Sequence, residues 1–232
     1  SDRSEMIAIT HNEVHVWDTS LVVDDEELAY DESLLSPDER RYAARFTNTS
    51  ARIQFVASRA KLRELLSRYT NEAPHDLRFS MTREGKPFLT SGREFEFNIT
   101  HSGDLVLFGI GYSRPVGVDM ERIKPIPRAL ELAKRYMAPD EHALVANAPP
   151  EERDRTFLSL WVKREGSGKA YGVGIWKVLE SSRRDTANQL FAEIMRDYMY
   201  RVIDYGSEYI ACVAALGADW QIVQLGSVRK AE

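Results

Sequence analysis

The stretch Pro115-Val-Gly-Val-Asp-Met-Glu121 organises the chain, because it sets two acidic side chains side by side. In a β-strand successive side chains point to opposite faces, so Asp119 and Glu121 share one face. Two neighbouring carboxylates against a core would repel each other, and one would take up a proton unless a cation lay between them. Mg2+ suits such a pair, because it needs few carboxylates and completes its shell with water and substrate phosphates. An isolated pair is more often the solvated face of an edge strand, so the rest of the chain must decide.

The composition is that of an ordinary globular protein. The 232 residues are 43% hydrophobic and 29% charged, enough for one large domain or two compact halves with a real core. With 31 basic and 36 acidic residues the formal charge is −5, so we expect no global attraction for nucleic acid or a membrane surface. No stretch reaches the length of a membrane span and no apolar signal region begins the chain, which predicts a cytoplasmic protein. Cys212, the single cysteine, is expected to be a core thiol.

The first half alternates strand and helix patterns. A serine cap followed by proline and two acids predicts a helix that begins at Ser36. Amphipathic spacing predicts a long helix from about Ser50 to Tyr69. Strands are predicted over Met6–Trp17, Leu77–Met81, Phe95–Thr100 and Leu105–Tyr112, of which the last two form a hairpin.

The second half repeats this composition in a different order. Helices are predicted over Arg128–Tyr136, Pro139–Ala146 and Glu151–Tyr171, the last ending at Gly172 and Gly174. Strands are predicted over Gly117–Glu121, Phe191–Met195, Tyr198–Asp204 and Tyr209–Leu216, with an edge strand around Ile222. These patterns predict an α+β fold of two halves, 1–113 and 114–232, each a small, mostly antiparallel sheet packed with a long helix. Because the element order differs, a duplication is a hypothesis and not a demonstrated repeat.

The long helix of the second half carries a second polar constellation. Glu165 and Lys169 lie four residues apart and share a helical face, where the usual meaning is a surface ion pair of about 0.3 to 0.5 kcal/mol. Gly166 and Gly168 each cost a helix about 1 kcal/mol relative to alanine. Their presence favours the close approach of a ligand, with a fraying helix as the alternative.

Several basic residues are candidates for binding anions. Arg52, Arg59 and Arg63 recur along one stripe of the first long helix. For Arg63 a solvated face with acidic partners is favoured, whereas Arg52 and Arg59 are predicted to bind phosphate. Arg45 belongs to a basic patch on the Ser36 helix, and Lys86 stands at the tip of a turn, although charges of this kind more often only solvate a surface.

The two constellations would converge if the halves pack together. In that arrangement Glu165 faces Asp119 and Glu121, and three carboxylates share one ion. The anion binders around it would be Lys169, Lys86, His101 and Arg52. Such a set suits phosphoryl-group chemistry, in which a metal ion neutralises a pyrophosphate and a carboxylate or water takes a proton. His101 has an equal alternative role, capping the hairpin that follows it.

At this point the chain resembles a known family. The motifs are Gly85-Lys86-Pro87, Phe97-Asn-Ile-Thr-His-Ser102, Gly117-Val-Asp-Met-Glu121 and Trp161-x-x-x-Glu165-x-x-x-Lys169. Together they look like the signature of the 4'-phosphopantetheinyl transferases of the surfactin-synthetase-activating type, single chains of two pseudo-symmetric α+β halves with the active site at their interface. The resemblance implies an enzyme that moves the 4'-phosphopantetheine arm of coenzyme A onto a serine of an apo acyl or peptidyl carrier protein. Adenosine 3',5'-bisphosphate would be released.

The resemblance also implies roles for single residues. The Mg2+ ligands would be Asp119, Glu121 and Glu165, and the catalytic residues would be Glu165, Lys169 and His101. Glu165 would deprotonate the serine, directly or through water, and Lys169 would contact the transferring phosphate. The coenzyme A contacts would be Arg45, Arg52, Arg59, Lys86, His101 and Lys169, with Arg52 near the 3'-phosphate.

The chain departs from the family pattern at three places. Glu39 and Tyr42 stand where some relatives carry lysines for the 3'-phosphate, so Arg40, Arg41 or Arg45 would have to substitute. Thr100 replaces a common serine and keeps its hydroxyl. Arg164-Glu165-Gly166 replaces the usual Lys-Glu-Ala or Lys-Glu-Ser, which leaves the pose of the following lysine open.

Two other functions compete with transfer. One is a protein that binds coenzyme A or a carrier protein without catalysis, which no feature of the sequence favours. The other is a metal-dependent phosphodiesterase, which would be expected to carry histidine or aspartate ligands for a second metal. The sequence predicts a monomer without a nucleic-acid or membrane partner, and it leaves the carrier and its pathway open.

Overall fold

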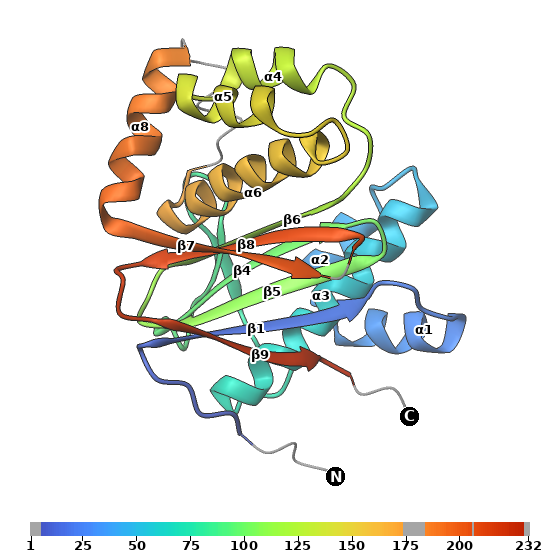
Figure 1. Cartoon of the computed structure of the whole chain (residues 1–232). Coiled ribbons are helices and arrows are strands. Elements are labelled where there is room, and N and C mark those ends of the chain that lie inside the picture. Colours follow the sequence, from blue (N-terminus) through green and yellow to red (C-terminus); the bar gives the residue numbers. More distant parts are fainter. Residues whose placement is uncertain (1–5, 174–183, 206, 230–232) are drawn as a thin grey trace.

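Two β-sheets lie at the centre of the computed structural model, which describes residues 6–173, 184–205 and 207–229 (Figure 1). The first sheet has the order β4 (Phe95–Ser102), β5 (Leu105–Tyr112), β1 (Glu13–Ser20) and β9 (Gln221–Ser227). The second has the order β6 (Val116–Arg122), β8 (Tyr209–Leu216) and β7 (Tyr198–Tyr205). A ribbon of β2 (Phe79–Met81) and β3 (Pro87–Leu89) stands beside them. Neighbouring strands are antiparallel except β1 and β9, which run parallel.

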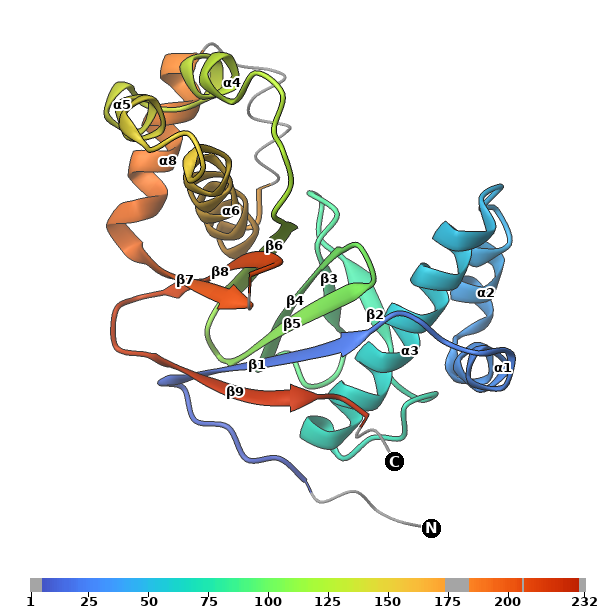
Figure 2. The same cartoon turned by 45° about the vertical axis from the view of Figure 1, so that its right-hand side comes forward.

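Each sheet carries one long helix on its outer face (Figure 2). The helices of the first half are α1 (Asp25–Leu34), α2 (Pro37–Ala43) and the long α3 (Thr49–Thr70). Those of the second half are α4 (Ala129–Tyr136), α5 (Pro139–Asn147), the long α6 (Arg153–Tyr171) and α8 (Arg184–Asp197). No described helix combines the length and the apolar character that crossing a bilayer requires. The predicted α+β fold, with a sheet and a long helix in each half, is confirmed.

Apolar side chains fill three layers between these elements. The helix α3 buries Leu62, Leu65 and Leu66 against the first sheet, at the spacing that keeps them on one helical face. Between the sheets, Val16 and Leu107 of the first sheet meet residues of β6 and β8. Each such fully buried side chain contributes on the order of 1.5 to 3 kcal/mol. The third layer joins α6 to β8 and the helices α4 and α5.

Two predicted strands differ from the observed elements. The segment Phe191–Met195 is part of the helix α8, and Phe191 and Ile194, three residues apart, are buried as a helical face requires. A short apolar run does not distinguish a strand from a buried helix, and here the helix is correct. The first strand begins at Glu13 rather than Met6, because residues 6–10 form no regular structure.

The chain crosses between the halves at its end. The strand β9 follows the second sheet in sequence, yet it pairs with β1 of the first sheet, with Val14 opposite Ile222. The predicted edge strand around Ile222 is therefore present. The predicted division of the chain between residues 113 and 114 stays a prediction.

Glycine brings α6 into direct contact with the second sheet. A Cβ at Gly117 of β6 would overlap with the carbonyl oxygen of Gly166 and the nitrogen of Ala170. A Cβ at Gly166 would lie 3.4 Å from the side chain of Cys212 on β8. Gly166 and Gly168 are both buried and helical, Gly168 in the last turn, so the helix does not fray at Gly166. Close packing of helix on sheet accounts for Gly166, and it sets the height of Glu165 and Lys169 above β6. The helix ends at Gly172, whose φ of 97° is left-handed, as predicted; Gly174 lies outside the described residues.

Candidate active site

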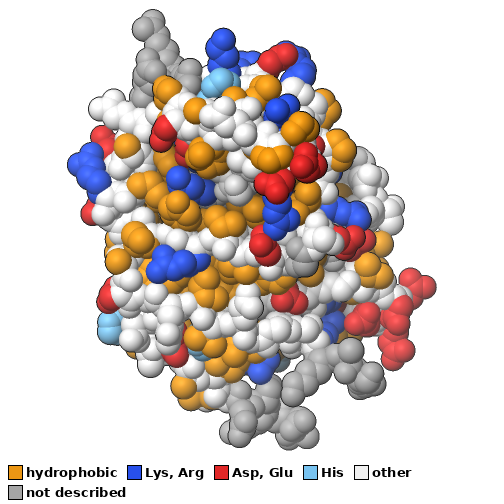
Figure 3. All heavy atoms as spheres, in the orientation of Figure 1, with side chains coloured by type: hydrophobic (Ala, Val, Ile, Leu, Met, Phe, Trp, Pro, Cys, Tyr) orange, Lys and Arg blue, Asp and Glu red, His pale blue; other side chains and the backbone are white. Residues whose placement is uncertain are grey.

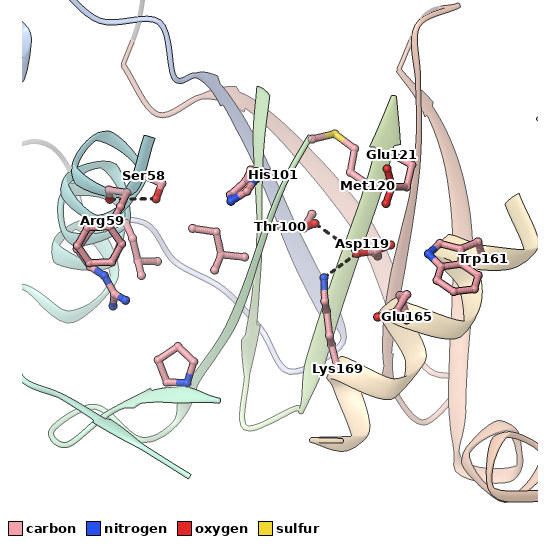
Figure 4. Close-up of a pocket in the computed structure, with 14 residues that line it drawn as sticks. Ser58, Arg59, Thr100, His101, Asp119, Met120, Glu121, Trp161, Glu165 and Lys169 are labelled. Atoms are coloured by element: carbon pink, nitrogen blue, oxygen red, sulfur yellow. Dashed lines mark hydrogen bonds and ion pairs between the residues drawn. The ribbon is translucent and has the colours of Figure 1, made fainter. Parts of the chain in front are cut away.

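A cavity of about 510 Å³ lies between the two halves of the molecule. It is lined by Phe55, Ser58, Arg59, Leu62, Pro87, Ile99, Thr100, His101, Asp119, Met120, Glu121, Trp161, Glu165 and Lys169. Figure 4 shows Ser58 and Arg59 of α3 on one side, Glu165 and Trp161 of α6 on the other, and the strands β4 and β6 between them. Both long helices and the two adjoining edge strands, β4 of the first sheet and β6 of the second, thus contribute to one cavity.

The strands β4 and β6 belong to different sheets, and polar side chains join them. The side-chain oxygen of Asn98 accepts a hydrogen bond from the nitrogen of Val118 at 2.9 Å, and the hydroxyl of Ser102 accepts one from Arg122 at 2.9 Å. Between them the Thr100 hydroxyl donates to Asp119 Oδ1 at 3.4 Å. These three residues of β4 alternate, so they share the face toward β6. The seam between the halves is therefore held by side chains in place of a backbone ladder, and it fixes Asp119 at the cavity floor.

Asp119, Glu121, Glu165 and Lys169 form what we call the cavity cluster. The ammonium of Lys169 donates to Asp119 Oδ1 at 2.6 Å and to the carbonyl oxygen of Val118 at 3.1 Å (Figure 4). Asp119 and Glu165 are buried, whereas the side chain of Lys169 is 28% exposed. Lys169 therefore contacts one of the three acidic side chains at this wall of the cavity, while the exposed Lys124 acts on Glu121 through space.

The surroundings disfavour the ionised form of each acid in the cavity cluster. Burial, against the opposing effect of Lys169, raises the pKa of Asp119. Burial and the nearby Asp119 carboxylate raise the pKa of Glu121. The same two causes raise the pKa of Glu165 to about 7. The three acids thus repel one another in a setting of low polarity, which is the condition under which a carboxylate gains most from an added cation.

The oxygen atoms of the cavity cluster are suited to a divalent cation. Asp119 Oδ2 and Glu165 Oε1 are buried and have no hydrogen-bond partner among the described residues. An unsatisfied buried oxygen costs free energy, and a hard cation such as Mg2+ is bound by oxygen atoms of this kind. The residues therefore fit the group. As they are placed, no three His, Cys, Asp or Glu side chains in the described ranges 6–173, 184–205 and 207–229 form a ready ligand set.

The structure brings some of the predicted anion binders to the cavity and leaves others away from it. Arg59 of α3 and His101 of β4 line it, and Arg59 Nε also lies 3.6 Å from Glu39 Oε1. Arg52 instead pairs with Glu32 of α1. Lys86 lies outside the lining and donates to the carbonyl oxygen of Val116 at 3.0 Å; burial lowers its pKa.

Two further basic side chains of the first half lie apart from the lining residues. Arg63 is fully buried and donates to Glu39 at 2.9 Å and to two backbone carbonyls, so the predicted solvated face is wrong, although its acidic partner is present. Arg45 is exposed just beyond the end of α2 and does not line the cavity.

Sequence reasoning missed part of the lining. Phe55 and Trp161 were not predicted as site residues, and both side chains border the cavity. Ser58 was not identified, although it stands one residue before Arg59 and faces the same space (Figure 4). Trp161 could have been found from Glu165, because residues four apart in a helix share a face.

The fold and the site define a protein of two halves that line one cavity with carboxylates and cationic side chains. Comparison with known proteins identifies its family. Residues 22–110 match the family profile "4'-phosphopantetheinyl transferase, N-terminal", and residues 115–214 match the "4'-phosphopantetheinyl transferase superfamily". The chain is 31% identical over 222 residues to the 4'-phosphopantetheinyl transferase HetI of a Nostoc species, covering 93% of this chain and 92% of that protein. It is 32% identical over 149 residues to the transferase Sfp of Bacillus subtilis, covering 64% and 65%.

The chain therefore belongs to the 4'-phosphopantetheinyl transferase family. It is an enzyme of the single-chain type with two halves, as its motifs predict. The family uses coenzyme A and acts on carrier proteins.

Proposed function

We propose that the cavity between the halves is the place where this transferase moves the 4'-phosphopantetheine group of coenzyme A onto a serine of an apo carrier protein. The observation that supports the proposal is the meeting of Asp119, Glu165 and Lys169 at one cavity wall, with two carboxylate oxygens that lack partners. Carboxylate oxygens without partners are suited to bind a cation, and the neighbouring lysine is suited to bind a phosphate.

Asp119, Glu121 and Glu165 would hold a divalent cation, for which we propose Mg2+. When bound, this ion would neutralise charge on the pyrophosphate of coenzyme A. Asp119 Oδ2 and Glu165 Oε1 are the oxygens best suited to it, because no other group in the described part of the chain hydrogen-bonds them.

Glu165 is our candidate for the base. A serine hydroxyl is a poor nucleophile until its proton is removed, and a base works best when its pKa is near the operating pH. Burial and the adjacent Asp119 raise the pKa of Glu165 to about 7 in the cation-free protein, and a bound cation would lower it, so the proposed role rests on the position of Glu165 in the cavity. The proton would pass to Glu165, directly or through water, as the serine oxygen bonds to the phosphorus that carries the pantetheine. The bond from that phosphorus to the leaving oxygen would break, and adenosine 3',5'-bisphosphate would depart.

The cationic side chains would orient the phosphates. Lys169 stands beside the acids and would stabilise negative charge on the transferring phosphate. Arg59 and His101, across the cavity, would bind other phosphates of coenzyme A. The predicted contacts of Arg45, Arg52 and Lys86 with coenzyme A stay predictions, as do a monomeric state and a cytoplasmic location.

Carrier proteins are generally acidic, so they are expected to dock on a basic or apolar surface. Figure 3 shows acidic side chains gathered at the edge formed by α1, whose first turn contains three acids, whereas the rest of this face mixes both signs. The α1 edge is therefore an unfavourable approach for an acidic carrier.

Intact-mass spectrometry of several apo carrier proteins tests the proposal. Each would be incubated with the enzyme, coenzyme A and Mg2+, with EDTA in the matched control. We expect the carrier to gain one phosphopantetheine on serine only when the metal is present. A failure of every carrier to gain mass, despite demonstrated binding of coenzyme A, would favour a binding protein without catalysis. An equal gain in EDTA would exclude the proposed role of the cation.

A further inference from the structure

Lys169 has two partners in the structure, and both lie on the strand that also supplies the predicted metal ligands. Its ammonium is 2.6 Å from Asp119 Oδ1 and 3.1 Å from the carbonyl oxygen of Val118. A lysine ammonium has three donors, so two are used by the protein. The lysine is thus bound to a carboxylate for which the proposed cation would also compete.

The cavity cluster divides into satisfied and unsatisfied oxygens. Asp119 Oδ1 accepts from Lys169 and, at 3.4 Å, from Thr100. The second oxygen, Asp119 Oδ2, and Glu165 Oε1 have no hydrogen-bond partner among the residues described. The single positive charge of Lys169 does not neutralise three acids, so the lysine replaces a divalent ion only in part.

The two partners differ in their freedom to move. The Asp119 side chain is 9% exposed and is fixed by the seam between the sheets, whereas the Lys169 side chain is 28% exposed and ends a four-carbon stem. Lys169 also borders the cavity. When a cation and phosphates enter, the lysine is the member of the pair that can leave.

We propose that Lys169 stands in for the divalent cation in the ligand-free enzyme, so that release of its ammonium from Asp119 couples cation binding to phosphate binding. The inference rests on the proposed metal ligands and goes beyond them. Without coenzyme A, the Lys169 ammonium on Asp119 Oδ1 repels a cation that approaches Asp119 Oδ2, and so weakens its binding. The phosphates of coenzyme A give the ammonium another partner, which frees Asp119 for the cation. By linkage, the cation favours coenzyme A to the same degree.

Calorimetric titration of Mn2+ into the enzyme without coenzyme A tests the stand-in role. Lys169→Met removes the ammonium and keeps most of the stem, and Lys169→Gln serves as a second variant should the first be unstable. Because a hydrogen bond between charged groups is lost from the competing state, we expect either variant to bind Mn2+ about tenfold more tightly than the wild type. Thermal melts confirm that each variant is folded.

Lys124→Met is the matched control. Lys124 is exposed and lowers the pKa of Glu121 through space, so its removal takes a positive charge from the vicinity of the acids and breaks none of their hydrogen bonds. Charges at the surface are screened, and we expect this variant to bind Mn2+ within about twofold of the wild type. A tenfold gain in Lys124→Met as well would assign the effect to general charge and overturn the stand-in role.

A second titration in the presence of coenzyme A measures the coupling. We expect coenzyme A to tighten Mn2+ binding more in the wild type than in Lys169→Met, by about the same tenfold factor. Equal or weaker Mn2+ binding by both Lys169 variants in the first titration would overturn the inference and leave the metal ligands standing. Absence of Mn2+ binding in the wild type and both variants, with and without coenzyme A, would instead overturn the metal ligands themselves.

Discussion

Two buried charge clusters lie next to each other on α6, and they differ in how fully their atoms are used. Arg164 faces away from the cavity and forms, with Glu141 and Lys163, what we call the back cluster. Its guanidinium donates to Glu141 Oε2 and to the side chain of Asn188. Glu165, the next residue, faces the cavity and keeps an oxygen without a partner in the described chain.

The back cluster contributes to stability, whereas the cavity cluster is available for function. In the back cluster Glu141 Oε2 also accepts from the nitrogen of Ala138, and Arg164 lies 4.5 Å from the ring centre of Phe191. Such a closed network holds elements of one fold together and offers nothing to a ligand. The cavity cluster keeps buried acceptors unsatisfied, which costs stability and is expected where a protein must bind an ion or a substrate.

The largest effect on transfer is expected from Asp119→Asn and Glu165→Gln. Loss of a cation ligand, or of the base, should lower the transfer rate by about 10²- to 10⁴-fold or more. The melting temperature of the metal-free protein should stay the same or rise for Glu165→Gln, because burial disfavours the ionised carboxylate. Intact-mass time courses and thermal melts check both. Normal turnover in the double variant would refute the metal assignment.

The next largest effect is expected from Gly117→Ala, which tests whether helix packing positions the cavity cluster. The added methyl group would overlap with the backbone at Gly166 and Ala170, so α6 must shift away from β6. A displacement of about 1 Å at a site of this kind costs on the order of 100-fold in rate, and overpacking costs about 1 to 3 kcal/mol of stability. Steady-state kinetics and melts measure the two losses. A variant with unchanged kinetics would show that the contact does not set the positions of Glu165 and Lys169.

A smaller effect, on the KM for coenzyme A, is expected from the arginines of α3, and it should differ between Arg59 and Arg52. Arg59 lines the cavity and also pairs with Glu39 at 3.6 Å, whereas Arg52 pairs with Glu32 and is not among the lining residues. Loss of one charged hydrogen bond to a phosphate is worth about 10-fold, so Arg59→Gln should raise the KM for coenzyme A by about that factor. Arg52→Gln should change it by less than about twofold. If Arg52→Gln raises the KM for coenzyme A more than Arg59→Gln does, a position in the cavity lining is a poor guide to coenzyme A contacts.

The smallest effect on transfer is expected from Glu141→Gln in the back cluster. Breaking a buried ion pair costs about 3 to 5 kcal/mol, which corresponds to a fall of roughly 10 °C in melting temperature for a chain of this size. The rate per folded molecule, measured well below the melting temperature, should stay within about twofold of the wild type. A large loss of rate in folded protein would contradict the division between the two clusters.

Sequence patterns predicted the cavity cluster because its signals are local. Asp119 and Glu121 alternate on a strand, and Glu165 and Lys169 share a helical face, so each pair follows from the period of its element. Their meeting also needed the resemblance to a family, since periodicity alone does not tell which faces oppose each other.

The rest depends on partners that are distant in sequence. Arg52 was expected at a phosphate, but Glu32 pairs with it from α1, a helix that the sequence patterns did not predict. Gly166 was read as room for a ligand, because its real neighbour, Cys212 on β8, is 46 residues away in sequence. The pairing of β9 with β1 likewise joins the two ends of the chain, and no local pattern reports such a contact.

The most direct test of the central claim is an anomalous-scattering experiment on crystals grown with coenzyme A and Mn2+. We expect one anomalous peak at coordination distance from Asp119 Oδ2 and Glu165 Oε1, with the Lys169 ammonium turned from Asp119 toward a phosphate of coenzyme A. Bound coenzyme A with no peak at these oxygens, or with the ion held elsewhere in the cavity, would contradict it.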